Sequence, residues 1–165
     1  MIKNIIWTII LSVLAGILQS TLLGNFALFG AVPDIALCIV VYSAYVNGTM
    51  AGQLSGFFSG LLIDFMSGAP LGLNCLIRTV IGAVTGIFKG AFFLDVFFLP
   101  FILCALATIA KALIMFLLNL IMGKVAPVYS LFSLIFWTEL GLNSLSAPIL
   151  FFLLRHFNFI TPRRS

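Results

Sequence analysis

Long apolar runs with almost no charge are the feature that most constrains this chain. Charged residues make up 7% of it and hydrophobic residues 63%, whereas soluble domains carry roughly 25% charged residues. A helix that crosses a bilayer needs about 20 consecutive apolar residues. The runs that approach this length are residues 5–23, 33–47, 48–66, 73–93, 97–122 and 130–155. We therefore expect an all-α integral membrane protein of about six transmembrane helices, forming one polytopic domain over residues 1–165.

The first two runs leave alternatives open. Residues 5–23 are longer than the apolar core of a signal peptide, which is about 7–15 residues, so we expect a retained span. Residues 33–47 are short, and only Asn47-Gly48 separates them from the third run. Tilting or local thinning of the bilayer accommodates a short span. A re-entrant segment is the alternative, and it would leave five spans.

The basic residues predict the orientation. Lys and Arg gather in the cytoplasmic loops of membrane proteins. With the N-terminus inside, the inner side holds Lys3, Lys89, Arg155, Arg163 and Arg164, and the outer side holds Arg78 and Lys124. This excess predicts that both termini are cytoplasmic. Because the basic residues are scattered, the net charge of +4 does not indicate nucleic-acid binding.

Glycines recur every four residues in the stretch GTMAGQLSGFFSGLLIDFMSG, residues 48–68. Residues four apart share one face of a helix, and small residues let helices approach closely in lipid. The third run has Gly48, Gly52, Gly56 and Gly60 on this spacing, and the fourth has Gly82, Gly86 and Gly90. The two stripes predict either helix packing within the chain or docking of a partner's helix, and internal packing is the commoner use.

Asp64, Arg78, Lys111 and Glu139 lie inside the apolar runs, away from the first and last residues of each run, where charges are costly and usually paired. Counted from the loops between neighbouring runs, Asp64 and Arg78 lie at similar depths, and so do Lys111 and Glu139. We expect these two intramembrane pairs. An ion path through Asp64, Lys111 and Glu139, or contact with a partner, is the alternative.

The sequence favours no enzyme, cofactor or metal site. Cys38, Cys75 and Cys104 are far apart, and His156 is the only histidine, so metal-ligand spacing is absent. The four acidic residues are scattered, and no nucleophile–base pair or phosphate loop is visible. Asp34, which follows Pro33, fits the start of a helix, where an acid complements the helix dipole.

One family resemblance covers essentially the whole chain. Pro33-Asp34 opens a run, and GFFSGLLIDFMSGAPLG follows at residues 56–72, with Gly60, Asp64 and Gly72 as motif positions. Together with the length, the retained first run and the near-absence of loops, this resembles the family of the rod shape-determining protein MreD.

The resemblance implies a non-catalytic inner-membrane component of the bacterial cell-elongation complex. Members of that family work with the bitopic protein MreC and, through it, connect MreB filaments to a cell-wall polymerase and transpeptidase pair. Their fold is similar to that of the substrate-binding subunits of energy-coupling-factor vitamin transporters. A small-molecule-binding subunit of such a transporter is therefore the alternative function.

Overall fold

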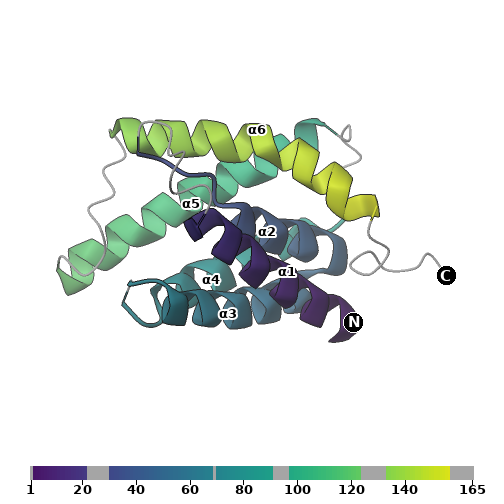
Figure 1. Ribbon diagram of the computed structural model, residues 1–165, viewed down its shortest axis with the longest axis horizontal. Helices are drawn as coiled ribbons and strands as arrows, with labels where there is room; N and C mark the ends of the chain where they lie inside the picture. The colour runs from purple at the N-terminus through teal and green to yellow at the C-terminus, as the bar shows by residue number, and fades with distance from the viewer. Residues whose placement is uncertain (1, 22–29, 69, 91–96, 124–132, 157–165) are drawn as a thin grey trace.

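The computed structural model describes residues 2–21, 30–68, 70–90, 97–123 and 133–156. These residues form six helices (Figure 1). They are α1 (Ile2–Thr21), α2 (Ile35–Asn47), α3 (Thr49–Met66), α4 (Leu73–Ile87), α5 (Phe98–Met122) and α6 (Leu134–His156). The predicted all-α architecture is therefore confirmed for the described residues.

The helices match the predicted runs in number, but three of them qualify as membrane spans by length and composition. These are α1 over Ile2–Gln19, α5 over Phe98–Ile121 and α6 over Leu134–His156. Helices α2 and α4 are apolar but shorter. The fourth helix ends at Ile87, six residues before the predicted end at 93. Six transmembrane spans therefore remain a prediction.

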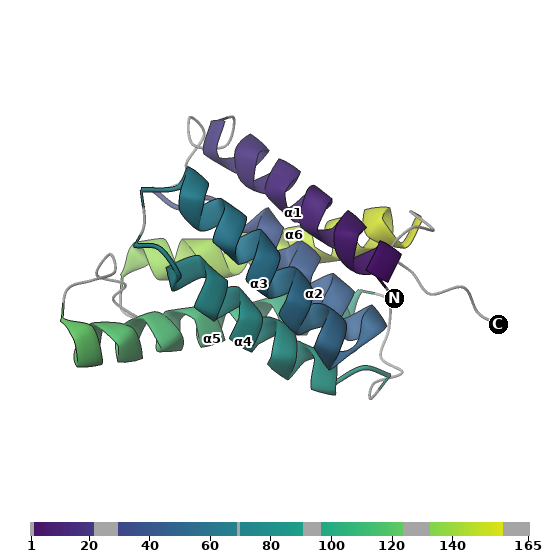
Figure 2. The ribbon, with the colours of Figure 1, turned by 90° about the horizontal axis from the view of Figure 1, so that it is seen from below.

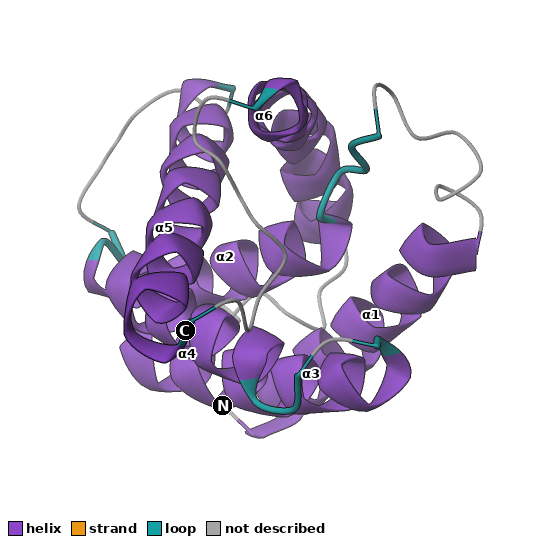
Figure 3. Cartoon of the chain, turned by 90° about the vertical axis from the view of Figure 1, so that its left-hand side faces the viewer, coloured by secondary structure: helices purple, strands orange, loops and turns teal. Residues whose placement is uncertain are grey.

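The short second run forms a helix in the middle of the protein (Figure 3). Every residue of α2 from Ala36 to Ala44 is buried, and the helix contacts each of the other five. A helix that is apolar on all sides belongs in a protein interior. Because α2 has protein on every side, it does not need the length of a lipid-facing span.

The other helices surround α2. Figure 2 shows α3 and α4 side by side, and α3 packs more extensively against α4 than against any other described helix. Helices α5 and α6 also pair with each other, on the far side of α2 from α3 (Figure 3). The first turn of α1 and the last turn of α6 lie toward the same end of the bundle (Figures 1 and 2).

The glycine stripes of α3 and α4 face each other. A β-carbon added at Gly52 would overlap the backbone of Gly82, and one at Gly56 would overlap the carbonyl of Arg78. At Gly60 an added β-carbon would lie 2.6 Å from the carbonyl oxygen of Asn74. Gly86 packs in the same way against the backbone of Thr49. Gly52, Gly56, Gly60, Gly82 and Gly86 therefore pack inside the chain and are not available for docking a partner's helix.

The ends of the two stripes differ from the prediction. Gly48 is the residue between α2 and α3, with φ of 98°, and the side chain of Lys89 lies against it. Gly90 follows α4, has φ of 70°, and has no atom of the described residues near enough to touch an added β-carbon. These two glycines serve chain turns, where positive φ favours glycine, although the backbone of Gly48 also lies against Gly86 of α4.

Large apolar side chains cover the outside of the protein. On α1 they recur at Ile6, Ile10 and Leu14, each about half exposed. The outer surfaces of α5 and α6 carry many more, including Leu120 and Phe152 at 72% exposure each. Soluble monomers rarely expose contiguous apolar patches of this extent, so this surface fits a lipid environment.

Candidate functional site

Asp34 is the centre of a buried ionic cluster. It precedes α2, and its Oδ1 accepts a hydrogen bond of 3.0 Å from the Leu37 backbone N–H, so it caps the helix as the sequence suggested. The same oxygen accepts from Nη2 of Arg78 at 2.9 Å, and Oδ2 accepts from Nζ of Lys111 at 2.9 Å. The residue is 4% exposed. Asp34 is therefore an anion shared by two cations as well as a helix cap.

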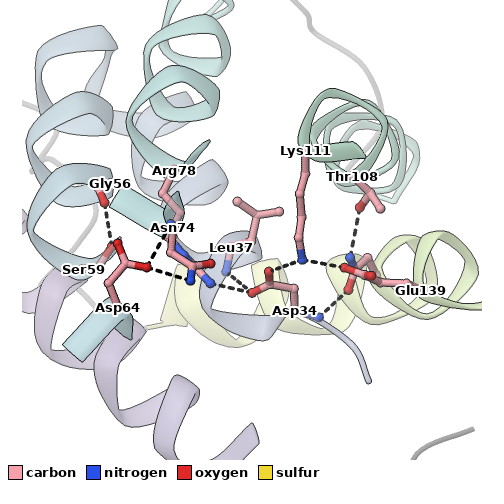
Figure 4. A network of polar contacts seen from close by, with 11 residues as sticks. Asp34, Leu37, Gly56, Ser59, Asp64, Asn74, Arg78, Thr108, Lys111 and Glu139 are labelled. Atoms are coloured by element: carbon pink, nitrogen blue, oxygen red, sulfur yellow. Dashed lines mark hydrogen bonds and ion pairs between the residues drawn. The ribbon is translucent and has the colours of Figure 1, made fainter. Parts of the chain in front are cut away.

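Lys111 connects this cluster to α6. Its Nζ donates to Oε1 of Glu139 at 2.8 Å, which is the pairing expected between α5 and α6. The four side chains come from the start of α2 and from α4, α5 and α6 (Figure 4). Two carboxylates and two cations leave the cluster neutral overall. Removing Asp34 would leave Arg78 without its carboxylate partner and Lys111 with Glu139 alone, and a buried charge without its partner is strongly destabilising.

Two further polar residues, which the sequence analysis did not single out, join the cluster to α5 and α6. The Oδ1 of Asn143 accepts from the Asp34 backbone N–H at 2.6 Å, and its Nδ2 donates to Oγ1 of Thr108 at 3.0 Å. Asn143 follows Glu139 by four residues and therefore shares its helix face. That spacing of two polar residues in an apolar helix was the available signal.

Asp64 forms a separate set of hydrogen bonds at the start of α4. Its Oδ2 accepts from the backbone N–H groups of Gly72 and Cys75, each at 3.0 Å. Its Oδ1 accepts from the backbone N–H of Asn74 at 3.0 Å and from the Asn74 side-chain amide at 2.9 Å. The first N–H groups of a helix have no partner within the helix. Asp64, near the end of α3, therefore caps α4 from outside.

Gly72 explains one position of the family motif. It is the residue before α4 and has φ of 95°, a conformation that residues with side chains rarely adopt. In this conformation its N–H donates to Asp64. Motif positions Asp64 and Gly72 thus act together at one helix start. Asp34 acts at another, where the carbonyl of Pro33 accepts from the Ile35 N–H at 3.0 Å.

The predicted ion pair between Asp64 and Arg78 is wrong. Arg78 pairs with Asp34, and both oxygens of Asp64 are occupied by the residues that begin α4. The physical reason is that Asp64 lies beside the first turn of α4, where unpaired N–H groups need an acceptor. In the described residues no hydrogen bond links Asp64 to Lys111 either, so the hydrogen bonds of these residues do not form the alternative path through Asp64, Lys111 and Glu139.

The cysteines do not gather around this cluster as metal ligands. Cys38, Cys75 and Cys104 are all buried. Among the residues that the structure describes, there is no group of three His, Cys, Asp or Glu side chains that could hold a metal ion.

A lipid-compatible surface around a buried ionic centre defines a helical membrane protein. The family model of the rod shape-determining protein MreD matches residues 1–159. The chain therefore belongs to the MreD family, a family of bacterial shape-determining proteins, as its motif suggested. No curated protein and no solved structure matches the chain, so the expected fold similarity to vitamin-transporter subunits remains a prediction without support.

Proposed function

We propose that this protein is a non-catalytic component of the cell-elongation complex in the inner membrane, where it binds an MreC-like bitopic protein. In this role it helps to position and regulate peptidoglycan synthesis by the cell-wall polymerase and transpeptidase. It acts on MreB filaments directly or through the partner. The observation that carries the proposal is the MreD family match over residues 1–159 of the 165.

The geometry supports a scaffold more than a catalyst. The described carboxylates of the core bind cations or the first N–H groups of a helix, and the ionic contacts connect α2, α4, α5 and α6. The apolar outer surfaces of α5 and α6 are large and offer area for a single-span partner within the bilayer. A protein that holds other proteins in fixed relative positions needs a rigid core of this kind.

The test is depletion of the protein in the bacterium that encodes it. Cells should lose their elongated shape while bulk peptidoglycan synthesis continues, and re-expression of the wild-type chain should restore the shape. Extraction in mild detergent should then recover an MreC-like protein with the tagged chain. Cells that keep their shape and starve for one vitamin would favour the transporter alternative instead.

A further inference from the structure

A cavity of about 340 Å³ with a mixed polar and apolar wall lies beside the ionic cluster. Its wall includes Gln19 of α1, Ser67 after α3 and Asn74 of α4, together with Asp34, Arg78 and Lys111. Gln19, Ser67 and Asn74 all lie near the ends or starts of their helices. The cavity therefore extends from one end of the bundle down to the charged centre.

Arg78 has donors that no described residue uses. The guanidinium carries five N–H groups, one on Nε and two on each terminal nitrogen. Only Nη2 reaches Asp34, and Nε and Nη1, which carry three of the five N–H groups, are buried and have no hydrogen-bond partner. The residue is 4% exposed. Buried polar groups are nearly always hydrogen-bonded, and Arg78 lines the cavity, so a rotation of its guanidinium would bring these unused donors to a ligand there.

The other wall groups favour an anion with several oxygens. Of the charged side chains that line the cavity, Arg78 and Lys111 are cationic and Asp34 is anionic. Two of these three groups are therefore cations, while Glu139, which pairs with Lys111 at 2.8 Å and keeps the whole cluster neutral, does not line the wall. The planar fork of an arginine matches phosphate and carboxylate oxygens. Oε1 of Gln19 is also buried without a partner and can accept from a hydroxyl on the same ligand.

We propose that this cavity binds a phosphate group, carried by a small solute or by the headgroup of an anionic phospholipid, with Arg78 as its main donor. Phosphate offers more acceptor oxygens than carboxylate and so meets more of the unused N–H groups. With both termini cytoplasmic, the end of α1 that carries Gln19 faces outward, and the ligand enters from the outer side. The site is independent of the proposed scaffold function.

Binding is measured on the full-length protein in nanodiscs of phosphatidylcholine. In one arm, inorganic phosphate is titrated at constant ionic strength, with acetate as the comparison. In the other arm, the nanodiscs contain increasing fractions of phosphatidylglycerol. The readout is the midpoint of thermal unfolding, and native mass spectrometry counts the lipids retained.

Three variants locate the site. Arg78→Lys keeps a cation near Asp34 but removes the fork, and Arg155→Lys makes the same change at an exposed arginine in the last turn of α6. Gln19→Leu removes the unused acceptor and leaves the ion pairs intact. We expect a saturable rise in the midpoint that Arg78→Lys weakens at least tenfold, Gln19→Leu about threefold, and Arg155→Lys less than twofold.

The outcomes distinguish a phosphate-bearing solute from a phospholipid headgroup. Saturation by phosphate alone identifies a solute, and saturation by phosphatidylglycerol alone identifies a lipid headgroup. The proposal is overturned if neither probe saturates, or if Arg78→Lys binds as tightly as Arg155→Lys, because water then fills the cavity. If Arg78→Lys binds phosphate normally but loses a co-purifying protein, an acidic side chain of a partner occupies the site and the proposal fails. If Arg78→Lys does not fold, unchanged binding by Gln19→Leu overturns it.

Discussion

Replacing Asp34 by asparagine separates the two roles that this residue has in the structure. Asparagine and aspartate are about equally good at capping a helix. The cap on Leu37 therefore survives in Asp34→Asn, and if capping were the only role, the free energy of unfolding would hardly change. What the variant removes is the negative charge that Arg78 and Lys111 share.

Removing that charge should lower the free energy of unfolding substantially. Each cation lies 2.9 Å from an Asp34 oxygen, and two unit charges about 4 Å apart attract by about 4 kcal/mol at an effective dielectric constant of 20. The asparagine oxygen retains part of this attraction, and breaking a buried ion pair costs about 3–5 kcal/mol. Single hydrogen bonds within membrane proteins are often weaker, up to about 1.7 kcal/mol. We therefore expect Asp34→Asn to lower the free energy of unfolding by about 2–5 kcal/mol.

Reversible unfolding in mixed micelles, with SDS as the denaturant, measures this difference. Asp34→Ala should lose about 1 kcal/mol more than Asp34→Asn, because it also removes the cap. Glu139→Gln should lose less, because Lys111 keeps Asp34 as a partner. A free energy of unfolding for Asp34→Asn within about 0.5 kcal/mol of the wild type would refute the central role assigned to the carboxylate.

Other perturbations test the helix contacts and the topology. Gly56→Ala should lower the free energy of unfolding by about 1–3 kcal/mol, because the added methyl group overpacks against α4. Gly141→Ala on α6, where an added β-carbon touches no atom of the described residues, should be neutral or stabilising by up to about 1 kcal/mol. Equal effects of the two variants in the same unfolding assay would show that α3 and α4 are not in close contact. Exchanging the charges of Asp64 and Arg78 should give no recovery of folded protein, since each has its own partners, and recovery above either single variant would contradict those contacts. A reporter that is active only outside the cytoplasm, fused after Ser165, should be silent if both termini are cytoplasmic, and strong activity would reverse that orientation.

The sequence predicts the helices, and it favours their closest contact over the alternative of docking a partner's helix. Apolar run length predicts the helices because a backbone in lipid must form its hydrogen bonds within its own segment. Glycine spacing predicts the α3–α4 contact because only small residues allow two helix backbones to approach so closely. Gly52 and Gly56 meet the backbone of α4 as the internal-packing interpretation requires.

The partners of the charges could not be obtained in the same way. Counting residues from a hairpin loop gives depth along the helix but not the direction in which a side chain points. The backbone carbonyl of Arg78 faces Gly56 of α3, whereas its guanidinium reaches Asp34. For Asp34, the neighbouring Pro33 predicts only a helix start. Its contacts with Arg78 and Lys111 span 44 and 77 residues of sequence, and a local pattern carries no information about them.

The short helix, the ionic cluster and the cavity meet at the start of α2. Helix α2 has 13 residues and is therefore about 20 Å long, shorter than a hydrocarbon core of about 30 Å. It begins at the level of Lys111, near the middle of α5. Non-helical backbone at such depth is tolerated only where it is buried in protein or lines a polar cavity. Val32 and Asp34 line such a cavity, and Asp34 is held there by cations from α4 and α5. Val32 and Asp34 would lie in the first turn of a longer α2, but in this structure they stand before the helix and line the cavity.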